Sequence, residues 1–291
     1  MKYFNYALLF VFFINVSCGS YDIHIPDNEK EESVEEGTEY ELVWAEEFDY
    51  EGLPDPYCWG YEQGYARNNE LQDYRVKDQR YSRVEDGKLI IEAAKDDHWG
   101  THKWTGEPYH FLYSSAELHY MGDVKFHYGR LDISAKIPIG KGIWPAIWML
   151  PVDEKYGGWP HSGEIDIMEY VWGDNPGHNE IFATVHTTDT NVNGNTIPSG
   201  TVTSETLDTE FHLYSLVWEK TYLQILFDNK VIFNYERKQK GSTPETWPFD
   251  QPFFLILNIA VGGDWGGVWG IDESIFPVRM EIDYVRYYQK K

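Results

Sequence analysis

The stretch Gly-Glu-Ile-Asp-Ile-Met-Glu-Tyr-Val, residues 163–171, begins by alternating acidic and aliphatic side chains. In a β-strand, side chains two residues apart share a face, so Glu164 and Asp166 point the same way. Strict alternation would then bury Glu169 among aliphatic side chains, and a buried unpaired carboxylate is costly. We therefore predict a β-bulge at Ile167-Met168, which returns Glu169 to the face of Glu164. Three acids would line one open face of a sheet.

Further strands are predicted along most of the chain. Short apolar or alternating runs recur between turn signals, whereas no long helical period and no repeat of 20–50 residues is visible. Such runs lie at residues 88–93, 129–137, 181–186, 211–218, 223–228, 253–260 and 279–288. We predict an all-β antiparallel sandwich or barrel. The length of 291 residues fits one large domain or two small ones, and with 42 % hydrophobic residues an all-β sandwich of this size can be a single domain, which we place over residues 40–291.

The charge and the aromatic content narrow the choice of partner. The chain has 48 acidic and 24 basic residues, a net charge of −24, of which only −6 lies in residues 1–40. An acidic body argues against nucleic acid and anionic membrane surfaces as partners. Trp, Tyr and Phe make up 17 % of the chain. Such aromatics either stack on a neutral sugar or fill a β core, and composition leaves both readings open.

The N-terminus has the layout of a secretory signal. Lys2 precedes an apolar run at residues 7–14, which is too short to span a membrane and ends in small residues and Cys18. The sequence Asn-Val-Ser-Cys resembles a bacterial lipoprotein processing site, with Cys18 as the lipid attachment point. The alternative is an ordinary cleaved signal with an incidental cysteine. We expect a signal over 1–18, an acidic flexible tether over 19–39, and an exported outer-membrane lipoprotein that touches the membrane only through its anchor.

Three clustered acids have two chemical uses. One is a cation site, and the other is cleavage of a glycosidic bond by two carboxylates. The Glu164 and Glu169 backbones are roughly 13 Å or more apart along a strand, yet inward-leaning side chains on a curved sheet can bring their carboxyls to about 5–5.5 Å, as a retaining mechanism needs. The tripeptide Glu281-Ile282-Asp283 repeats the acidic alternation without a third acid. We interpret this second tripeptide as a solvated or structural pair of acids on a strand.

The 163–171 stretch, with Trp159-Pro160 before it, resembles the active-site motif of glycoside hydrolase family 16. Further matches follow in order at residues 67–72, 129–130, 142–151, 183–186, 247–252 and 257–263. The resemblance implies a β-jelly roll, two packed antiparallel sheets with a sugar cleft on the concave face, and retention of anomeric configuration. The form with Met168 inserted resembles the laminarinase-like β-glucanases, which act on β-1,3-glucans, mixed β-1,3/1,4-glucans or both.

The resemblance also implies roles for the three acids. Glu164 corresponds to the nucleophile, Glu169 to the general acid/base and Asp166 to the assisting carboxylate. The nearby charges of Glu164 and Asp166 should raise the pKa of Glu169, so that it starts protonated. Once Glu164 is esterified its charge is lost, and Glu169 can act as a base toward water. The chemistry needs no cofactor.

Substrate-binding roles follow from the same resemblance. The residues are Asn69, Arg130, Trp144, Trp148, Trp159, His186 and Trp265. Indole faces stack on sugar CH groups, and the polar members offer hydrogen bonds to hydroxyls, with Asn68 as the neighbouring alternative to Asn69. The competing readings are core tryptophans and a structural histidine. A structural Ca²⁺ on the convex face is common in the family, and Glu47, Gly87 and Asp283 are the best-matching positions; the alternative is no metal.

The leading function is an endo-acting retaining β-glucan hydrolase, a monomer whose partner is a neutral β-glucan. A non-catalytic glucan-binding protein would lack one of the two glutamates, and both are present. A sulfated substrate would be repelled by the acidic body, but an agarase-like galactan hydrolase and a transglycosylase remain open. An insertion such as 97–109 or 189–201 could close one end of the cleft and favour exo action.

Overall fold

The computed structural model describes residues 40–173, 179–238 and 240–291. The predicted signal, the lipid site at Cys18 and the tether lie outside the described residues. Within the described ranges no helix is long and apolar enough to cross a membrane.

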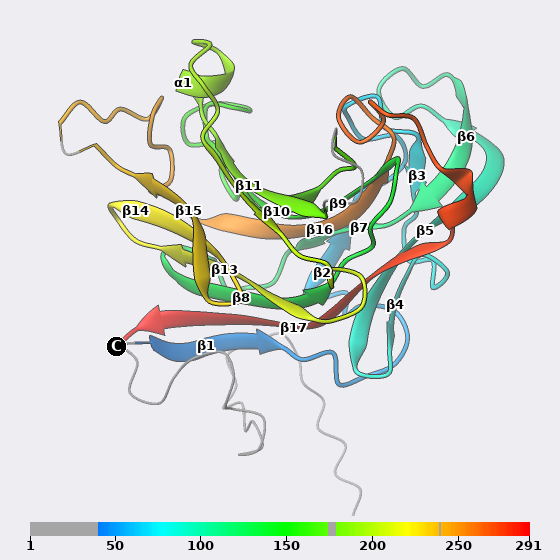
Figure 1. Cartoon of the computed structure of the whole chain (residues 1–291), viewed down its shortest axis with the longest axis horizontal. Helices are drawn as coiled ribbons and strands as arrows, with labels where there is room; N and C mark the ends of the chain where they lie inside the picture. The colour runs from blue at the N-terminus through cyan, green and yellow to red at the C-terminus, as the bar shows by residue number, and fades with distance from the viewer. Residues whose placement is uncertain (1–39, 174–178, 239) are drawn as a thin grey trace, which may run out of the picture.

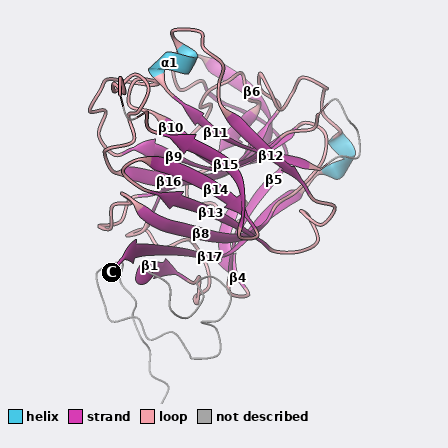
Figure 2. Ribbon diagram, turned by 60° about the vertical axis from the view of Figure 1, so that its left-hand side comes forward, coloured by secondary structure: helices cyan, strands magenta, loops and turns pink. Residues whose placement is uncertain are grey.

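Two β-sheets pack face to face (Figures 1 and 2). The first has seven strands, in the spatial order β12 (Ser199–Thr203), β11 (Glu180–His186), β10 (Glu164–Tyr170), β9 (Ile143–Pro151), β16 (Phe253–Val261), β7 (Glu117–Tyr120) and β2 (Trp59–Tyr61). All of its neighbouring strands run antiparallel.

The second sheet has ten strands. Its main order is β15 (Lys230–Glu236), β14 (Tyr222–Phe227), β13 (His212–Trp218), β8 (Gly129–Lys136), β17 (Val278–Lys290), β5 (Lys88–Thr101), β6 (Pro108–Ser115) and β3 (Gln72–Tyr74). In addition, β1 (Tyr40–Glu46) pairs with β17, and β4 (Ser82–Glu85) pairs with β5. Only the β3–β6 pair among these strands is parallel. In the described part of the chain, the helical elements are the short α1 (Thr188–Asn191) and a 3₁₀ turn at Glu273–Ile275.

The core between the sheets follows from the alternation along the strands. On β8, Leu131, Ile133 and Ala135 belong to one large buried cluster that also contains Ile165 of β10. Much of the aromatic content lies there too, including Trp44, Trp59, Trp218 and Trp247. Burial of each such large side chain contributes roughly 1.5–3 kcal/mol. Much of the aromatic content therefore fills the core, and only the remaining aromatic side chains can contact a ligand.

The predicted β-bulge on β10 is confirmed. Asp166 pairs with Thr184 of β11. The next pair joins Glu169 to Phe182, so the two residues Ile167-Met168 oppose a single residue. Both bulged side chains are fully buried in the core, and Glu169 returns to the face of Glu164 and Asp166.

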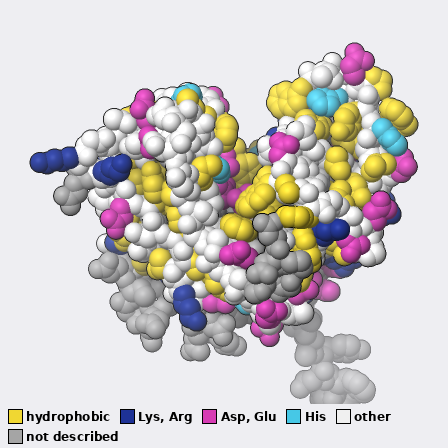
Figure 3. Space-filling view, turned by 45° about the horizontal axis from the view of Figure 1, so that its top comes forward, with side chains coloured by type: hydrophobic (Ala, Val, Ile, Leu, Met, Phe, Trp, Pro, Cys, Tyr) yellow, Lys and Arg dark blue, Asp and Glu magenta, His cyan; other side chains and the backbone are white. Residues whose placement is uncertain are grey.

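The face of the seven-stranded sheet that turns away from the main core is the floor of a hollow. Ala146, Trp148 and Ile256 form a separate small cluster on it. The space-filling view shows a depression between two raised parts of the molecule (Figure 3). One raised part carries α1, and the other carries the β5–β6 hairpin, as Figure 1 shows. The three acids of β10 lie on this open face.

Candidate active site

The structure brings the three β10 carboxylates together. Glu164 is partly exposed, whereas Asp166 and Glu169 are buried with exposed fractions of 1 % and 9 %. Asp166 is hydrogen-bonded to Glu164, and ligand atoms of these two acids and of His186 lie within 4.8 Å of one another. Within the described residues, this is the only cluster of three or more His, Cys, Asp and Glu side chains close enough to share a cation.

Burial and like charges raise the pKa values of two of these acids. Burial raises the pKa of Asp166 well above its ordinary value, and the charge of Glu164 raises it further. Burial also raises the pKa of Glu169, and the charges of Asp166 and Glu164 add to the effect. The indole N–H of Trp144 and the charge of His186 act in the opposite direction, but the net shift of the Glu169 pKa is upward.

A different indole holds each of the two glutamates. Trp159 Nε1 donates to Glu164 Oε2 at 2.6 Å, and Trp144 Nε1 donates to Glu169 Oε1 at 3.0 Å. An indole N–H is only a donor, so each bond fixes both the carboxylate and the ring plane. Trp159 remains 58 % exposed and Trp144 is half-buried, so ring surface beside each acid stays open.

His186 lies opposite Glu164 on β11 and is oriented by α1. Its Nε2 is 3.3 Å from Asp166 Oδ2, an ion-pair distance without the alignment of a hydrogen bond. Its Nδ1 lies 3.0 Å from Nδ2 of Asn191, the last residue of α1. When that amide donates, the proton of a neutral imidazole sits on Nε2, facing Asp166.

Two further predicted residues lie at the rim near Glu169. Trp265 makes edge contacts with Trp144 and with Phe182, at ring-centroid distances of 5.5 Å and 5.1 Å. Asn69 is exposed, and its Nδ2 donates to Asp264 Oδ1 at 2.8 Å, which ties its loop to the loop of Trp265. These segments are far apart in the sequence but form one rim.

Trp148 lies on the floor rather than on an open wall. It is only 8 % exposed, and the guanidinium of Arg67 lies 5.0 Å from its ring centroid. Trp148 Nε1 donates to Asn258 Oδ1 at 2.8 Å. The stacking surface predicted for Trp148 is therefore mostly covered, and Arg67 holds the more exposed position.

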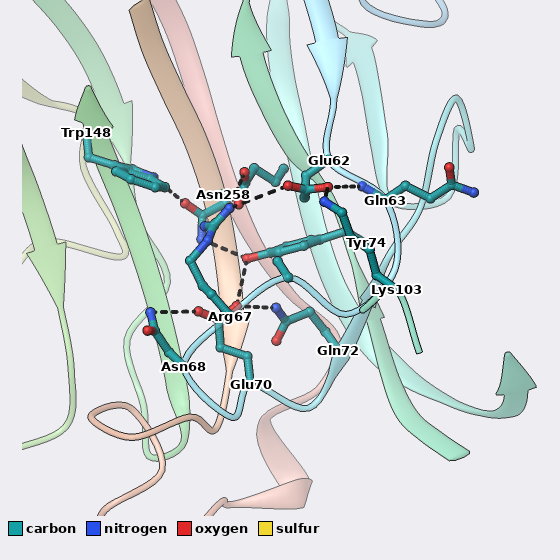
Figure 4. Close-up of polar contacts among 12 residues, drawn as sticks. Glu62, Gln63, Arg67, Asn68, Glu70, Gln72, Tyr74, Lys103, Trp148 and Asn258 are labelled. Atoms are coloured by element: carbon teal, nitrogen blue, oxygen red, sulfur yellow. Dashed lines mark hydrogen bonds and ion pairs between the residues drawn. The ribbon is translucent and has the colours of Figure 1, made fainter. Parts of the chain in front are cut away.

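Behind this floor lies a buried polar network (Figure 4). Asn258 Nδ2 donates to the Tyr74 hydroxyl at 3.0 Å, and that hydroxyl donates to Glu70 at 3.5 Å. Glu70 also accepts from Gln72 at 2.7 Å. Burial raises the pKa of Glu70 to about 7. The network fixes the floor from behind, since each member is tied to a neighbour.

The prediction that Arg130 binds substrate is wrong. Arg130 lies on β8 of the ten-stranded sheet, where its neighbour Leu131 faces the core, so Arg130 faces outward. Its guanidinium donates to Asp132 Oδ1 at 2.7 Å and to Asn229 Oδ1 at 2.8 Å. A match in sequence did not reveal to which sheet the strand belongs.

The positions suggested for Ca²⁺ lie on or beside the ten-stranded sheet. Both carboxylate oxygens of Glu47 accept from Arg286, at 2.8 Å and 2.9 Å. Burial raises the pKa of Asp283, and the charge of Glu47 raises it further. Gly87 lies in the turn between β4 and β5. A guanidinium thus already neutralises Glu47, and a cation there would compete with Arg286.

Sequence reasoning missed three residues of the site. Arg67 and Asn258 both lie in stretches that carried the family resemblance, but their positions did not stand out without the fold. Phe182 lies two residues from Thr184 on β11, so the alternation that places His186 on the open face would also have placed Phe182 there.

Comparison with known proteins agrees with this geometry. The model of the family described as "Glycosyl hydrolases family 16" matches residues 71–286. A β-glucanase of Rhodothermus marinus is 42 % identical over 258 residues, which cover 86 % of this chain and 85 % of that protein. The X-ray structure of the laminarinase from Rhodothermus marinus is 41 % identical and gives a TM-score of 0.78, over 87 % of this chain and 98 % of that one.

A third similarity comes with a bound sugar. SCLam, a non-specific endo-β-1,3(4)-glucanase, is 39 % identical, and a mutant of it was solved with 1,3-β-D-cellobiosyl-glucose at the active site. Its TM-score is 0.77, over 94 % of this chain and 99 % of that one. The family match, the identities and the jelly-roll structures agree: the chain belongs to glycosyl hydrolase family 16 and is a glycoside hydrolase.

Proposed function

We propose that this enzyme is an endo-acting retaining β-glucan hydrolase that cleaves β-1,3-glucan, mixed-linkage β-1,3-1,4-glucan or both. The observation that carries the proposal is the β10 arrangement, in which Glu164 and Glu169 flank Asp166 on one open face and each glutamate is held by its own indole. The β-glucanase and laminarinase named above support glucan as the substrate.

In the first step Glu164 attacks the anomeric carbon and forms a glycosyl ester, while Glu169 gives its proton to the departing glycosidic oxygen. The raised pKa of Glu169 keeps that proton available. Burial and the Glu164 charge raise the pKa of Asp166 as well. In its protonated form the Asp166 carboxyl can donate a hydrogen bond to Glu164 and hold it in position for attack.

In the second step the negative charge of Glu164 no longer acts on Glu169. The ester at Glu164 carries no charge, so one cause of the raised Glu169 pKa disappears. Glu169 then removes a proton from water, which attacks the anomeric carbon and releases Glu164. If a sugar hydroxyl replaces water, the same intermediate gives transglycosylation.

The surrounding residues are proposed to hold the sugar. The open ring surfaces of Trp159, Trp144 and Trp265 suit the CH faces of glucosyl units. His186 Nε2 lies 3.3 Å from Asp166 Oδ2. We propose that His186 binds a hydroxyl of the glucosyl unit that lies beside Asp166. Asn69 contributes from the rim, where its amide is exposed.

Product analysis on laminarin, mixed-linkage β-glucan and agarose tests this function. We expect a series of glucan oligosaccharides from one or both glucans, with the β-anomer formed first in an NMR time course. Products from agarose alone would favour the galactan alternative, and an α-anomer formed first would overturn retention. A Glu164→Gln variant with wild-type activity would overturn the mechanism.

The N-terminal segment is proposed to export the enzyme and attach it to the outer membrane through Cys18. Mass spectrometry of the mature N-terminal peptide tests this, with Cys18→Ser as the control that should release the enzyme into the soluble fraction. A mature N-terminal peptide without lipid would overturn the anchor.

A structural Ca²⁺ beside the ten-stranded sheet and a monomeric state also belong to the proposal. Glu47 and Asp283 carry carboxylates of the type that Ca²⁺ prefers, and the ion would displace the Arg286 guanidinium from Glu47. Bound Ca²⁺ would raise Tm and EDTA would lower it, whereas an unchanged Tm would exclude a stabilising ion. Light scattering during size exclusion tests whether the mass is that of a single mature chain.

A further inference from the structure

The hairpin formed by β5 and β6 carries a continuous aromatic face beside the cleft. His98 and Phe111 stack at 5.4 Å, and Phe111 contacts Tyr109 at 4.7 Å. His102 then stacks with Tyr65, a residue outside the hairpin, at 4.4 Å. The raised part of the molecule that carries this hairpin is rich in hydrophobic and histidine side chains and borders the hollow (Figure 3).

Trp104 is the exposed member at the tip of this hairpin. Trp104 is 67 % exposed as a residue, although its Nε1 donates to the Ala66 carbonyl at 2.9 Å. The ammonium of Lys103 lies 5.0 Å from the ring centroid and is itself paired with Glu62. An indole that is held by its N–H and open on its ring binds a flat ligand at low entropic cost.

Trp104 is linked to the active site through adjacent residues. Ala66, its hydrogen-bond partner, precedes Arg67, which lies over Trp148 on the cleft floor. Trp148 is directly opposite Asp166 in the pairing of β9 and β10. The hairpin tip is thus held against the loop that carries Arg67, the residue that covers the floor at Trp148.

The opposite face of the hairpin supplies a matched comparison. Trp99 is 71 % exposed and stacks on His110 at 4.8 Å. Because successive side chains of a strand point to opposite faces, Trp99 faces away from His98 and from the face that bears Tyr109. Trp99 and Trp104 are therefore equally exposed tryptophans on one hairpin, of which only Trp104 is linked to the cleft.

We propose that Trp104 is a remote stacking site for a glucosyl unit of a long, neutral β-glucan whose reacting bond lies at Glu164 and Glu169. Two observations favour a neutral polysaccharide over a charged one: Lys103 is neutralised by Glu62, and the neighbouring face is aromatic. The inference rests on the proposed function and adds to it a preference for long chains over short oligosaccharides.

The test compares Trp104→Ala, Trp99→Ala and wild type on polymeric laminarin and on a laminari-tetraose. We expect Trp104→Ala to raise KM for the polymer by about three- to tenfold, the size of one aromatic stacking contact, with kcat unchanged. Its kcat/KM on the tetraose should stay within about twofold of wild type, and Trp99→Ala should match wild type on both substrates.

A second measurement separates binding from turnover. In the Glu164→Gln background, affinity electrophoresis in laminarin should show weaker retardation for Trp104→Ala than for Trp99→Ala, and Trp104→Phe should restore retardation in part. Equal behaviour of the two alanine variants, or an equal loss on the tetraose, would overturn the inference while leaving the proposed function intact. A wild-type enzyme that neither binds nor cleaves any glucan would overturn both.

Discussion

Two strands of this protein carry the same tripeptide, Glu-Ile-Asp, and only one of them builds a reactive site. On β10 the central Ile165 is fully buried, and on β17 the central Ile282 is equally buried. The register shifts between Asp166 and Glu169 on β10, and between Ile282 and Tyr284 on β17. Both strands therefore bury the central residue and carry an irregularity close to it.

The difference lies in what the neighbouring strands and loops place opposite the acids. Glu281 is paired with Lys136 at 3.0 Å, and Asp283 accepts from Ser134 at 3.4 Å. On β10, by contrast, Glu164 meets an indole N–H, and no lysine or arginine is among the causes that shift the pKa of Asp166. Glu281 is thus paired with a lysine, whereas the β10 acids lie beside one another, two indoles and His186, and burial with like charges raises the pKa values of Asp166 and Glu169.

Replacing one carboxylate in each tripeptide gives the largest expected contrast. Glu164→Gln removes the nucleophile and should lower kcat/KM on a glucan by at least about 10³-fold, or ~4 kcal/mol of transition-state stabilisation. Glu281→Gln removes half of a surface ion pair and should leave kcat/KM within about twofold. Comparable losses in the two variants would mean that the chemistry is not centred on β10.

Deleting Met168 tests whether the bulge or the alternation places Glu169. Without Met168 the strand alternates regularly, so all three acids remain on the open face, but a fully buried side chain is lost. We expect the free energy of unfolding to fall by about 2–5 kcal/mol in urea titrations. Turnover should remain well above that of Glu164→Gln. Activity as low as in Glu164→Gln would show that the bulge geometry itself is required.

Glu46 is a buried acid outside the active site, and it serves as a comparison for the buried acids of β10. Glu46 is 9 % exposed, accepts from Trp59 Nε1 at 3.3 Å, and burial raises its pKa to about 7. A raised pKa in the folded state means that stability is complete below about pH 4.5 and is lost as pH rises toward 7.

Glu46→Gln should abolish that loss. We expect it to raise the free energy of unfolding by up to about 3 kcal/mol at pH 8 and to change it little at pH 4. Glucan hydrolysis should be unaffected, because Glu46 lies on β1 of the other sheet. A stability gain of equal size at both pH values would point to packing rather than to titration.

The smallest expected effect is a shift in the pH at which kcat/KM falls on the alkaline side, called here the alkaline limb. Glu169 must be protonated to act as the acid, so kcat/KM falls as pH rises through its pKa. When Asp166 loses its proton at rising pH, its charge raises the pKa of Glu169. Asp166→Asn removes that charge and should move this limb to lower pH, by less than about one unit, since burial is the larger cause of the raised Glu169 pKa. Asp283→Asn should leave the limb in place, and an alkaline shift in Asp166→Asn would contradict this electrostatic account.

Much of the fold and the centre of the site could be predicted because they depend on short-range rules. Alternation along a strand and the cost of a buried carboxylate were enough to place the three acids and the bulge at Ile167-Met168. Family resemblance added the tryptophans that contact Glu164 and Glu169. The errors came where a residue's surroundings belong to other strands.

Arg130 and Trp148 show what the sequence by itself did not decide. Alternation tells which residues of a strand share a face, but not which sheet the strand joins, and β8 joins the sheet away from the cleft. Likewise, nothing near Trp148 in the chain indicates that Arg67, more than eighty positions earlier, covers its ring. The sequence determined local periodicity, while the tertiary structure decided which distant partners meet each side chain, because pairing and screening depend on distance in space.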